Sequence, residues 1–505
     1  MKTKTKDYLL YRFWEIIPGA LVWLTFIFLL AISFINPLWG IYFIIVFDVY
    51  WLLRVTYLFI YLLISWTRYR KEIKIHWLDK LKQDYSVGEK NYQDYWHIIF
   101  LPTYKEPYQV IEDSMESLKN ADYDTKKFFI VLAGEEGDKE HFQTVATKIV
   151  AKYRPYFHDI LVTLHPKNLP GELRGKGSNM FWAGQRAKEY VDQAGWDYKK
   201  IIVSAFDIDT RAHEQYFSYL TYAFLKHPNS YRSSFQPLTL YHNNVWQSDP
   251  ITRVVANSTT FWLLTDLARS ERLLTFSSHS MSWQALVDVG FWQNNIVTED
   301  SRIFLQCFIH YDGDYQVTPM YITVSMDTVA VGKLWKNLIN QYKQIRRWAW
   351  GVEHFPYMMW HFSRNKKISR RKALIYLWNQ TEGVHSWATA PLVIFLMGYL
   401  PLWLAERVHE TSAVTQAAPD ILSNLMRGAI FGLIVTAFMS VYILPKKSGP
   451  PWRVAFDYLI SLLQWILFPV TFIIFGSIPA IEAQTRLMLG KYMGFWTTEK
   501  TRLAK

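Results

Sequence analysis

Two closely spaced aspartates carry the clearest chemistry in this chain. Asp207 and Asp209 directly follow the apolar run 201–206, and alternate residues of an extended chain point to the same side, so both carboxylates can address one ligand. A hard divalent cation such as Mg²⁺ prefers carboxylate and phosphate oxygens. The pair therefore predicts a site for such a cation and a diphosphate, with Asp209 and Asp207 as metal ligands. A pair of solvated loop acids is the structural alternative.

Thr298, Glu299 and Asp300 stand before the apolar run 303–309. A threonine N-cap with acids in the first turn is an ordinary start of a helix, and for this motif alone that interpretation is preferred. A carboxylate near a metal site can instead take a proton from an acceptor hydroxyl. Under the functional interpretation, Asp300 is the catalytic base and Glu299 is a substrate contact.

The segment 333–351 repeats apolar residues with a helical period, among basic and aromatic residues. This pattern predicts an amphipathic helix on a membrane surface. At about 100° per residue, Gln344 and Trp348 share the face opposite the apolar one, and Arg347 lies about 60° away. We expect these three side chains to face a catalytic cleft, where Arg347 can neutralise a diphosphate and Trp348 can stack on a sugar.

Short apolar runs indicate the fold of the middle of the chain. Strands that are buried on both faces read as such runs, and helical spacing of apolar residues separates the first three runs. Alternating strands and helices predict an α/β domain with a mostly parallel sheet and helices on both sides. The runs are 97–101, 128–132, 160–164 and 201–205.

Ligands of such sheets bind beyond the carboxyl ends of the strands. That rule places Thr103, Glu106, the acidic turn that contains Glu135, and the aspartate pair around one cleft, as candidate substrate contacts. Lys176 belongs to the glycine-rich turn 171–179. Such a turn can hold phosphate through backbone N–H groups and a lysine, although a solvated loop is the alternative.

Composition limits the class of protein. Half of the 505 residues are hydrophobic and the net charge is +12. Lys and Arg form no single dense run, and many flank apolar spans, so membrane lipids and anionic nucleotide substrates are the expected partners and nucleic acid is not. The only cysteine, Cys307, lies in an apolar run and is expected in the core.

Apolar stretches long enough to cross a bilayer, which takes about 20 residues, lie at both ends of the chain. The first two form a hairpin around Pro37, and this hairpin is too long for a signal peptide. One segment after the middle domain is expected to be re-entrant or split, at Pro469 or Pro479, so that the spans number five or six. The stretches are 14–34, 41–66, 388–404, 429–444 and 455–478.

Flanking charges predict a multi-pass protein of the plasma membrane whose N-terminus and middle domain lie in the cytoplasm. Three crossings after the middle domain would leave the C-terminus outside, whereas its basic residues favour the inside, so both sides stay open for this terminus. The residues behind this prediction are Lys2, Lys4, Lys6, Arg68, Arg70, Lys71, Lys500, Arg502 and Lys505. Within the second span, Asp48 and Arg54 project from different faces of a helix. We expect them to pair with neighbouring helices or to line a polar path.

Four regions follow from these patterns. They are a transmembrane hairpin (1–75), a cytoplasmic catalytic domain (76–332), interfacial amphipathic helices (333–383) and a C-terminal transmembrane region (384–505).

With these motifs in this order, the chain resembles the membrane-embedded family 2 glycosyltransferases, whose processive members include cellulose, chitin and hyaluronan synthases. Asp207-x-Asp209 looks like the D-x-D motif, Thr298-Glu299-Asp300 like T-E-D, and Gln344-x-x-Arg347-Trp348 like Q-x-x-R-W. The likeness runs from about 97 to 351 and includes the flanking spans.

The resemblance implies an α/β domain of the glycosyltransferase A type, which agrees with the lack of a G-x-G-x-x-G motif after the first strand. It implies inverting transfer from a nucleotide-diphosphate sugar, most often a UDP-sugar, to a growing polysaccharide at the cytoplasmic membrane face, and it leaves export open. Asp300 would be the base, Asp207 and Asp209 would hold Mg²⁺ or Mn²⁺, and Arg347 and Trp348 would secure pyrophosphate and acceptor.

Lys176 matches the family's lysine after the third strand. The family usually has an aspartate after the second strand for the nucleotide base, whereas this chain has glutamates there. Glu135, Glu136 or Asp138 is expected to replace it.

Two alternatives remain from the sequence. A non-processive enzyme would add one sugar to a lipid or polyprenyl phosphate, although the Q-x-x-R-W motif favours chain elongation. A transporter with a nucleotide-sensing domain is the alternative of another class. Transporters usually contain repeated membrane bundles, and this chain has no internal repeat.

Overall fold

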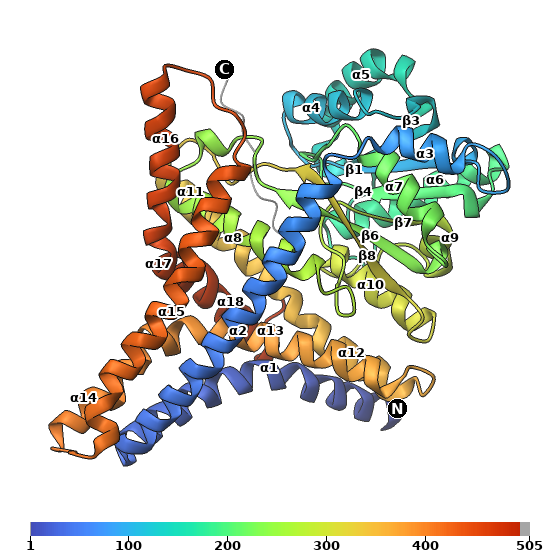
Figure 1. The fold of residues 1–505 in the computed structure, drawn as a ribbon. Coiled ribbons are helices and arrows are strands. Elements are labelled where there is room, and N and C mark those ends of the chain that lie inside the picture. Colours follow the sequence, from blue (N-terminus) through green and yellow to red (C-terminus); the bar gives the residue numbers. More distant parts are fainter. Residues whose placement is uncertain (1, 495–505) are drawn as a thin grey trace.

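The computed structural model describes residues 2–494, with the backbone alone for residues 2–4. An α/β domain packs against long apolar helices from both ends of the chain (Figure 1). The predicted α/β domain inserted between apolar helices is thereby confirmed. Lys500, Arg502 and Lys505 lie outside the described residues, as do the side chains of Lys2 and Lys4.

An eight-stranded sheet forms the centre of the domain, in the order β3-β2-β1-β4-β7-β6-β8-β5. The prediction of a mostly parallel sheet holds for β1 to β4, but β7 runs antiparallel to both β4 and β6 and makes the sheet mixed. The strands are β1 (Trp96–Pro102), β2 (Phe128–Glu135), β3 (Asp159–His165), β4 (Ile201–Ala205), β5 (Arg211–Ala212), β6 (Ser233–Leu240), β7 (His279–Ser282) and β8 (Gln316–Ser325).

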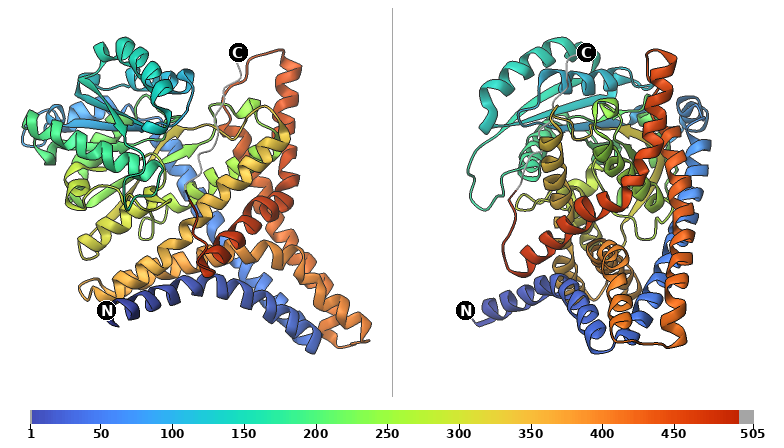
Figure 2. Two further views of the ribbon diagram at one scale, coloured as in Figure 1. Left: turned by 180° about the vertical axis from the view of Figure 1, so that it is seen from behind. Right: turned by 90° about the vertical axis from the view of Figure 1, so that its left-hand side faces the viewer.

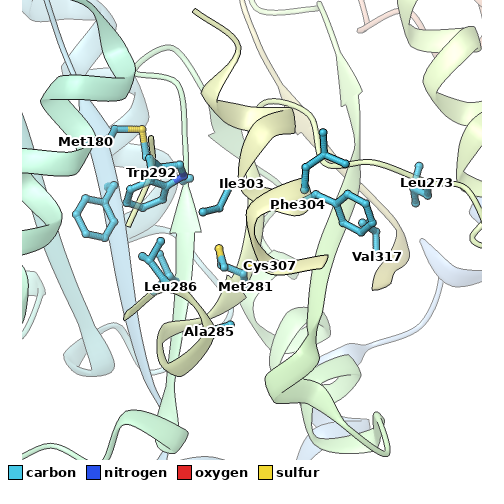
Figure 3. Packing of buried hydrophobic residues seen from close by; sticks show 14 of the residues in the cluster. Met180, Leu273, Met281, Ala285, Leu286, Trp292, Ile303, Phe304, Cys307 and Val317 are labelled. Carbon is cyan, nitrogen blue, oxygen red and sulfur yellow. The ribbon is translucent and has the colours of Figure 1, made fainter. Parts of the chain in front are cut away.

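Alternate residues of the central strands fill two apolar layers, as the pleat of a strand requires. Ile98 and Phe100 of β1 pack with α6 and α10, whereas Ile99 and Leu101 pack with α4 and α5 on the other face. Figure 3 shows part of the first layer, where the fully buried Cys307 lies among apolar side chains, as predicted.

The helices of the domain enclose this sheet. They are α3 (Trp77–Tyr85), α4 (Tyr108–Lys119), α5 (Lys139–Tyr153), α6 (Lys176–Ala194), α7 (Tyr216–Lys226), α8 (Pro250–Leu267), α9 (Trp283–Asp288) and α10 (Glu299–His310).

Two helices and a short 3₁₀ turn link the domain to the apolar helices (Figure 2): α11 (Leu334–Ala349), η8 (Trp350–Glu353) and α12 (His354–Arg364). The predicted amphipathic helix is α11, but its apolar face does not lie wholly on lipid. Trp335 near its start is 74% exposed, whereas Ile345 and Ala349 near its end are 4% exposed. The second half of the helix is therefore enclosed by protein.

Among the described residues, four helical segments are long and apolar enough to cross a membrane, and a fifth results if one pair bent by 49° counts as a single span. That bend lies at Leu396, between α13 and α14, and not at Pro469 or Pro479 as expected. Between those two prolines the helix continues through a π-helical turn, η11 (Ile473–Ser477). The apolar helices are α1 (Lys2–Ile35), α2 (Pro37–Glu72), α13 (Arg370–Phe395), α14 (Leu400–Arg407), α15 (Ala413–Ile443), α16 (Pro451–Leu463), α17 (Phe468–Phe472) and α18 (Ile478–Met488).

Arg54 of α2 forms an ion pair with Glu382 of α13 and donates a hydrogen bond of 3.2 Å to the Tyr50 hydroxyl. Within residues 2–494, the buried Oδ1 of Asp48 has no hydrogen-bonding partner, so the expected pairing with a neighbouring helix is found for Arg54 and not for Asp48. Because a charge within apolar helices needs a counter-charge, this pair fixes α13 against α2.

Gly134, the residue before Glu135 in β2, packs tightly against α5. A Cβ atom at this position would lie 2.4 Å from Cδ1 of Phe142. The close approach of strand and helix therefore depends on the missing side chain.

We expect Gly134→Ala to lower the free energy of unfolding by about 1–3 kcal/mol, because the added methyl group displaces the Phe142 ring. Thermal unfolding of the purified protein measures this loss. Gly383→Ala in α13 is the matched control, because nothing lies within 4 Å of its added Cβ and alanine is the better helix former. An equal loss in both variants would contradict the packing argument.

Candidate active site

A cavity of about 610 Å³ lies beyond the carboxyl ends of the strands and contains the site residues predicted from the sequence except Glu136 and Asp138. Its walls come from the loops after β1, β2, β4, β6 and β8, from the starts of α6 and α10, and from α11. The predicted residues along it are Thr103, Glu106, Glu135, Lys176, Asp207, Asp209, Glu299, Asp300, Gln344, Arg347 and Trp348.

Lys176, the first residue of α6, binds three carboxylates from two other segments. Its Nζ lies 2.7 Å from Oδ1 of Asp207, 2.8 Å from Oδ2 of Asp300 and 3.4 Å from Oε1 of Glu299. The lysine side chain is 10% exposed. Burial lowers the pKa of the Lys176 ammonium, but the three carboxylates outweigh it and raise the pKa above its ordinary value. Lys176 is thus a fixed positive charge and does not lie in the solvated loop of the alternative interpretation.

Asp207 and Asp209 are each held by residues outside their own strand. Asp207 Oδ2 accepts a hydrogen bond of 2.6 Å from Ser277 Oγ, and Asp209 Oδ2 accepts one of 2.9 Å from the backbone N–H of Asp327. Asn243 Nδ2 donates to the Asp209 carbonyl at 2.8 Å. The two carboxylates are therefore ordered within the cavity, unlike a pair of solvated loop acids.

The aspartate pair suits a hard divalent cation, because both side chains offer carboxylate oxygens. Within residues 2–494, no group of three or more His, Cys, Asp or Glu side chains has the geometry of a complete metal site. Mg²⁺ commonly takes only one or two carboxylates and completes its shell with substrate phosphates and water. Asp209 and Asp207 fit that kind of site.

The hydroxyl of Thr298 does not cap α10, although Thr298 occupies the N-cap position. It donates instead to Oε1 of Glu353, whose Oε2 accepts a hydrogen bond of 3.0 Å from Trp350 Nε1. The predicted helix start is confirmed, with Thr298 at the N-cap position and two acids in the first turn, but the hydroxyl makes no capping hydrogen bond. The hydroxyl connects the Glu299–Asp300 segment to η8, which directly follows α11.

A second connection between the same elements runs through Arg302. Its side chain is buried, stacks on the Tyr357 ring with Cζ 3.9 Å from the ring centroid, and donates from Nε to His354 Nδ1 at 3.2 Å. Burial, and next the charge of Arg302, lower the pKa of His354 well below its ordinary value. The neutral ring therefore accepts at Nδ1 and donates from Nε2 to Ser301 Oγ, 2.7 Å away.

The cavity is lined by Gln344, Arg347 and Trp348, so these side chains face a cleft as predicted. The Trp348 ring lies 6.2 Å from the Tyr241 ring, centroid to centroid. Gln344 Oε1 accepts a hydrogen bond of 3.2 Å from Gln341 Nε2. Ile345 also lines the cavity, so polar and apolar sides of α11 both contribute to its wall.

Glu135 is the only one of the three acids expected after β2 that is found among the lining residues. It is buried and lies 3.3 Å from Nε of Arg174. Glu136 accepts from the backbone of Lys167, and Asp138 pairs with His141. Glu135 alone remains a candidate for the nucleotide-base contact.

Thr103 and Glu106 form a small polar pair at the end of β1, in which the Thr103 hydroxyl donates to Glu106 Oε2 at 2.8 Å. Both residues line the cavity, as expected.

Three further residues of this site were missed in the sequence. Tyr241 follows β6, Asp327 follows β8, and Ser277 precedes β7, and all three line the cavity. The rule that ligands bind beyond strand ends would have found the first two. It could not be applied, because β6 and β8 were not recognised as strands.

Glu299 titrates unusually for a carboxylic acid. It is 3% exposed, and burial, followed by the charge of Asp300, raises its pKa to about 7. The folded protein therefore resists ionisation of Glu299 at a pH where the unfolded chain ionises readily.

Because the folded-state pKa of Glu299 lies above the unfolded value of about 4.5, the protein loses stability as the pH rises through about 7. Between about pH 5 and pH 8, the free energy of unfolding of wild type should fall by an amount on the order of 1–3 kcal/mol. Glu299→Gln should not show this fall, because glutamine does not ionise. Thermal unfolding at a series of pH values, without nucleotide, measures this. Parallel pH profiles of wild type and variant would contradict the assignment.

Glu353→Ala is expected to cost about 1–3 kcal/mol of stability, because the half-buried Thr298 hydroxyl and the Trp350 N–H lose their acceptor. Glu353→Gln keeps one acceptor oxygen and should recover part of the loss. Hydrogen exchange of the amides from 298 to 301 should rise in Glu353→Ala beyond the change elsewhere in the domain. A uniform rise would mean that Glu353 does not tether this segment.

Comparison with known proteins finds remote likenesses among solved structures. The mannosyltransferase PcManGT from Pyrobaculum calidifontis, in complex with GDP-Man and Mn²⁺, aligns with a TM-score of 0.43 and 14% identity, over 85% of this chain and 99% of that chain. S. aureus TarS 1–349, in complex with UDP-GlcNAc, aligns with a TM-score of 0.34 and 12% identity, over 64% of this chain and 92% of that chain. No protein-family model and no curated protein matches the sequence.

Proposed function

We propose that the protein is a membrane-integrated glycosyltransferase that moves a sugar from a nucleotide-diphosphate sugar to an acceptor. The observation that carries the proposal is the meeting of three sequence motifs in one cavity. Residues from three segments far apart in the chain line the same space: Asp207 and Asp209, Glu299 and Asp300, and Arg347 and Trp348. Sugar transfer from a nucleotide requires acids that bind a metal, a base that takes a proton, and a cation that binds the diphosphate.

The proposed reaction follows from the charges of these groups. Asp300 takes the proton of an acceptor hydroxyl as the hydroxyl oxygen bonds to the anomeric carbon. The bond from that carbon to the diphosphate breaks on the opposite side, so the configuration inverts. The nucleotide leaves with the bonding electrons, and the cation of Arg347 stabilises the charge on its diphosphate.

Asp207 and Asp209 would hold Mg²⁺ or Mn²⁺, which supplies further positive charge to the diphosphate when it is bound. Lys176 separates Asp207 from Asp300 and relieves the repulsion between their carboxylates. Its ammonium keeps the base and the metal-binding pair at a fixed spacing.

A growing polysaccharide is the acceptor that we propose. Aromatic and polar side chains of α2, α8, α13 and α17 also line the cavity. Trp51, Trp262 and Trp387 offer flat apolar faces for sugar rings, and Asn379 and Gln380 offer hydrogen bonds. A passage of this composition suits a chain of sugars and is compatible with export.

Transfer of one sugar to a lipid or polyprenyl phosphate is the second candidate. Phe468 and Phe472 of the apolar helices also line the cavity, which supports an acceptor with a hydrocarbon chain. We propose the plasma membrane as the location and the cytoplasm as the side of the catalytic domain, because that side holds nucleotide sugars and the charges flanking α1 and α2 favour it.

Asp300→Asn should lower the transfer rate by about 10²–10⁴-fold, because the amide cannot accept the proton. The variant should still bind UDP- or GDP-sugar, as measured by titration calorimetry. Asp314→Asn is the matched control, because Asp314 is exposed, pairs with Arg232 and lies outside the cavity. Transfer at a near-normal rate by Asp300→Asn would rule out Asp300 as the base.

A panel of UDP- and GDP-sugars, offered to purified protein in membranes with Mg²⁺ or Mn²⁺, identifies the donor. Product length by gel electrophoresis then separates the two acceptors, since a ladder of lengths requires repeated transfer and a single product does not. Label that crosses the membrane without incorporation into product would instead support the transporter.

A further inference from the structure

The turn between α12 and α13 carries a dense group of cations, contrary to the expectation of no dense basic run. The basic residues Arg364, Lys366, Lys367, Arg370, Arg371 and Lys372 fall within 364–372 and are all exposed. We refer to this segment as the basic turn.

Little of this charge is neutralised by the protein. Arg364 lies 3.1 Å from Oδ1 of Asp7, and Lys367 lies 3.2 Å from Oδ2 of Asp312. Within residues 2–494, Lys366, Arg370 and Arg371 have no hydrogen-bonding or ion-pairing side-chain partner. The basic turn therefore holds an excess of positive charge on the surface.

The basic turn lies where two apolar helices begin. Figures 1 and 2 show it beside the start of α1. The rings of Tyr11 in α1 and Trp360 in α12, just before the turn, meet edge to face with centroids 5.7 Å apart. Directly beyond the turn, α13 exposes Leu374 (65%) and Trp378 (68%), and α1 exposes Leu9 (61%). The cations thus border an apolar surface, and an exposed tryptophan at such a border is typical of a membrane interface.

The basic turn is also fixed to the catalytic domain. Ile368 is 5% exposed, and a Cβ on Gly313 would touch it at 3.3 Å. Lys372 Nζ donates to the Gly313 carbonyl at 2.8 Å, and Asn365 Nδ2 donates to Asp312 Oδ1 at 2.8 Å. Asp312 and Gly313 directly follow α10, the helix that begins with Glu299 and Asp300.

We propose that the basic turn is a binding site for the headgroups of anionic phospholipids. Clustered Lys and Arg beside membrane helices attract acidic headgroups, and arginine pairs well with phosphate oxygens. The adjoining apolar faces of α1 and α13 accommodate the acyl chains of the same lipid, which a soluble anion or an acidic protein would leave uncovered. A bound headgroup contacts a segment that is attached to the end of α10 opposite the candidate base. The proposal does not depend on the sugar-transfer reaction.

The test compares two variants that lose the same number of charges. Lys366→Gln, Arg370→Gln and Arg371→Gln together remove the unpartnered cations of the turn. Lys139→Gln, Lys148→Gln and Lys199→Gln together remove exposed lysines of the catalytic domain as the matched control. Each full-length protein is reconstituted in phosphatidylcholine bilayers with trace spin-labelled phosphatidylglycerol or spin-labelled phosphatidylcholine. Electron paramagnetic resonance then gives the fraction of each lipid held at the protein surface.

Wild type should hold phosphatidylglycerol about threefold more strongly than phosphatidylcholine, and the turn variant should lose at least about half of this preference. The control variant should keep it. About 1 M salt should abolish the preference of wild type, because screening at that concentration acts within about 3 Å. This salt series tests the proposal even if the turn variant does not fold.

Equal preferences in the two variants, or a wild-type preference that survives high salt, would overturn the proposal. A further experiment measures thermal stability in bilayers of phosphatidylcholine alone, with inorganic phosphate or polyglutamate added. Stabilisation of wild type but not of the turn variant by either anion would also overturn the proposal. The first result would identify a site for a soluble anion, and the second a surface for an acidic protein.

Discussion

The arrangement of the site depends on one ammonium group. Lys176 Nζ contacts carboxylates at the end of β4 and at the start of α10, while Lys176 itself begins α6. Three acids so close together would repel one another without a cation between them, and a buried lysine without acids would give up its charge. Each side of the cluster therefore requires the other. Glu353 and Arg302 extend the same connection from α10 to the elements that follow α11, so the motif residues of distant segments share one rigid framework.

Much of the domain could be predicted from the sequence, because the strongest signals are local. The apolar runs predicted β1 to β4, and the alternation of side chains along a strand placed Asp207 and Asp209 on one side of the chain, where both line the cavity. Strands β6 and β7 lack such runs, since β6 reads Ser-Ser-Phe-Gln-Pro-Leu-Thr-Leu and β7 reads His-Ser-Met-Ser. Their polar side chains are buried because they form hydrogen bonds with other strands, such as Ser204 Oγ with Ser280 Oγ at 2.7 Å. A pattern of hydrophobicity cannot reveal such pairs.

The contacts between segments were beyond prediction for the same reason. Helical phase correctly placed Gln344, Arg347 and Trp348 on the cavity side of α11, because phase is a property of one helix. The hydroxyl of Thr298 was expected to cap its own helix, yet it donates to the half-buried Glu353 carboxylate of η8, which is the stronger acceptor. Likewise, hydropathy identified the apolar helices, but the counter-charge of Arg54 is a glutamate on another helix, and the bend at Leu396 has no proline at its position.

The cavity has walls from two parts of the molecule, so the α/β domain alone cannot form it. Loops after the strands form one side, whereas α11, α13 and α17 form the other. A soluble fragment released by proteolysis at the borders of the catalytic domain would retain the aspartates and Lys176 but lose Arg347, Trp348 and the whole opposite wall. Under the proposed function, such a fragment would present an open surface exposed to water, which could hold a nucleotide but could not exclude hydrolysis. The apolar helices would then form part of the reaction chamber as well as the membrane anchor.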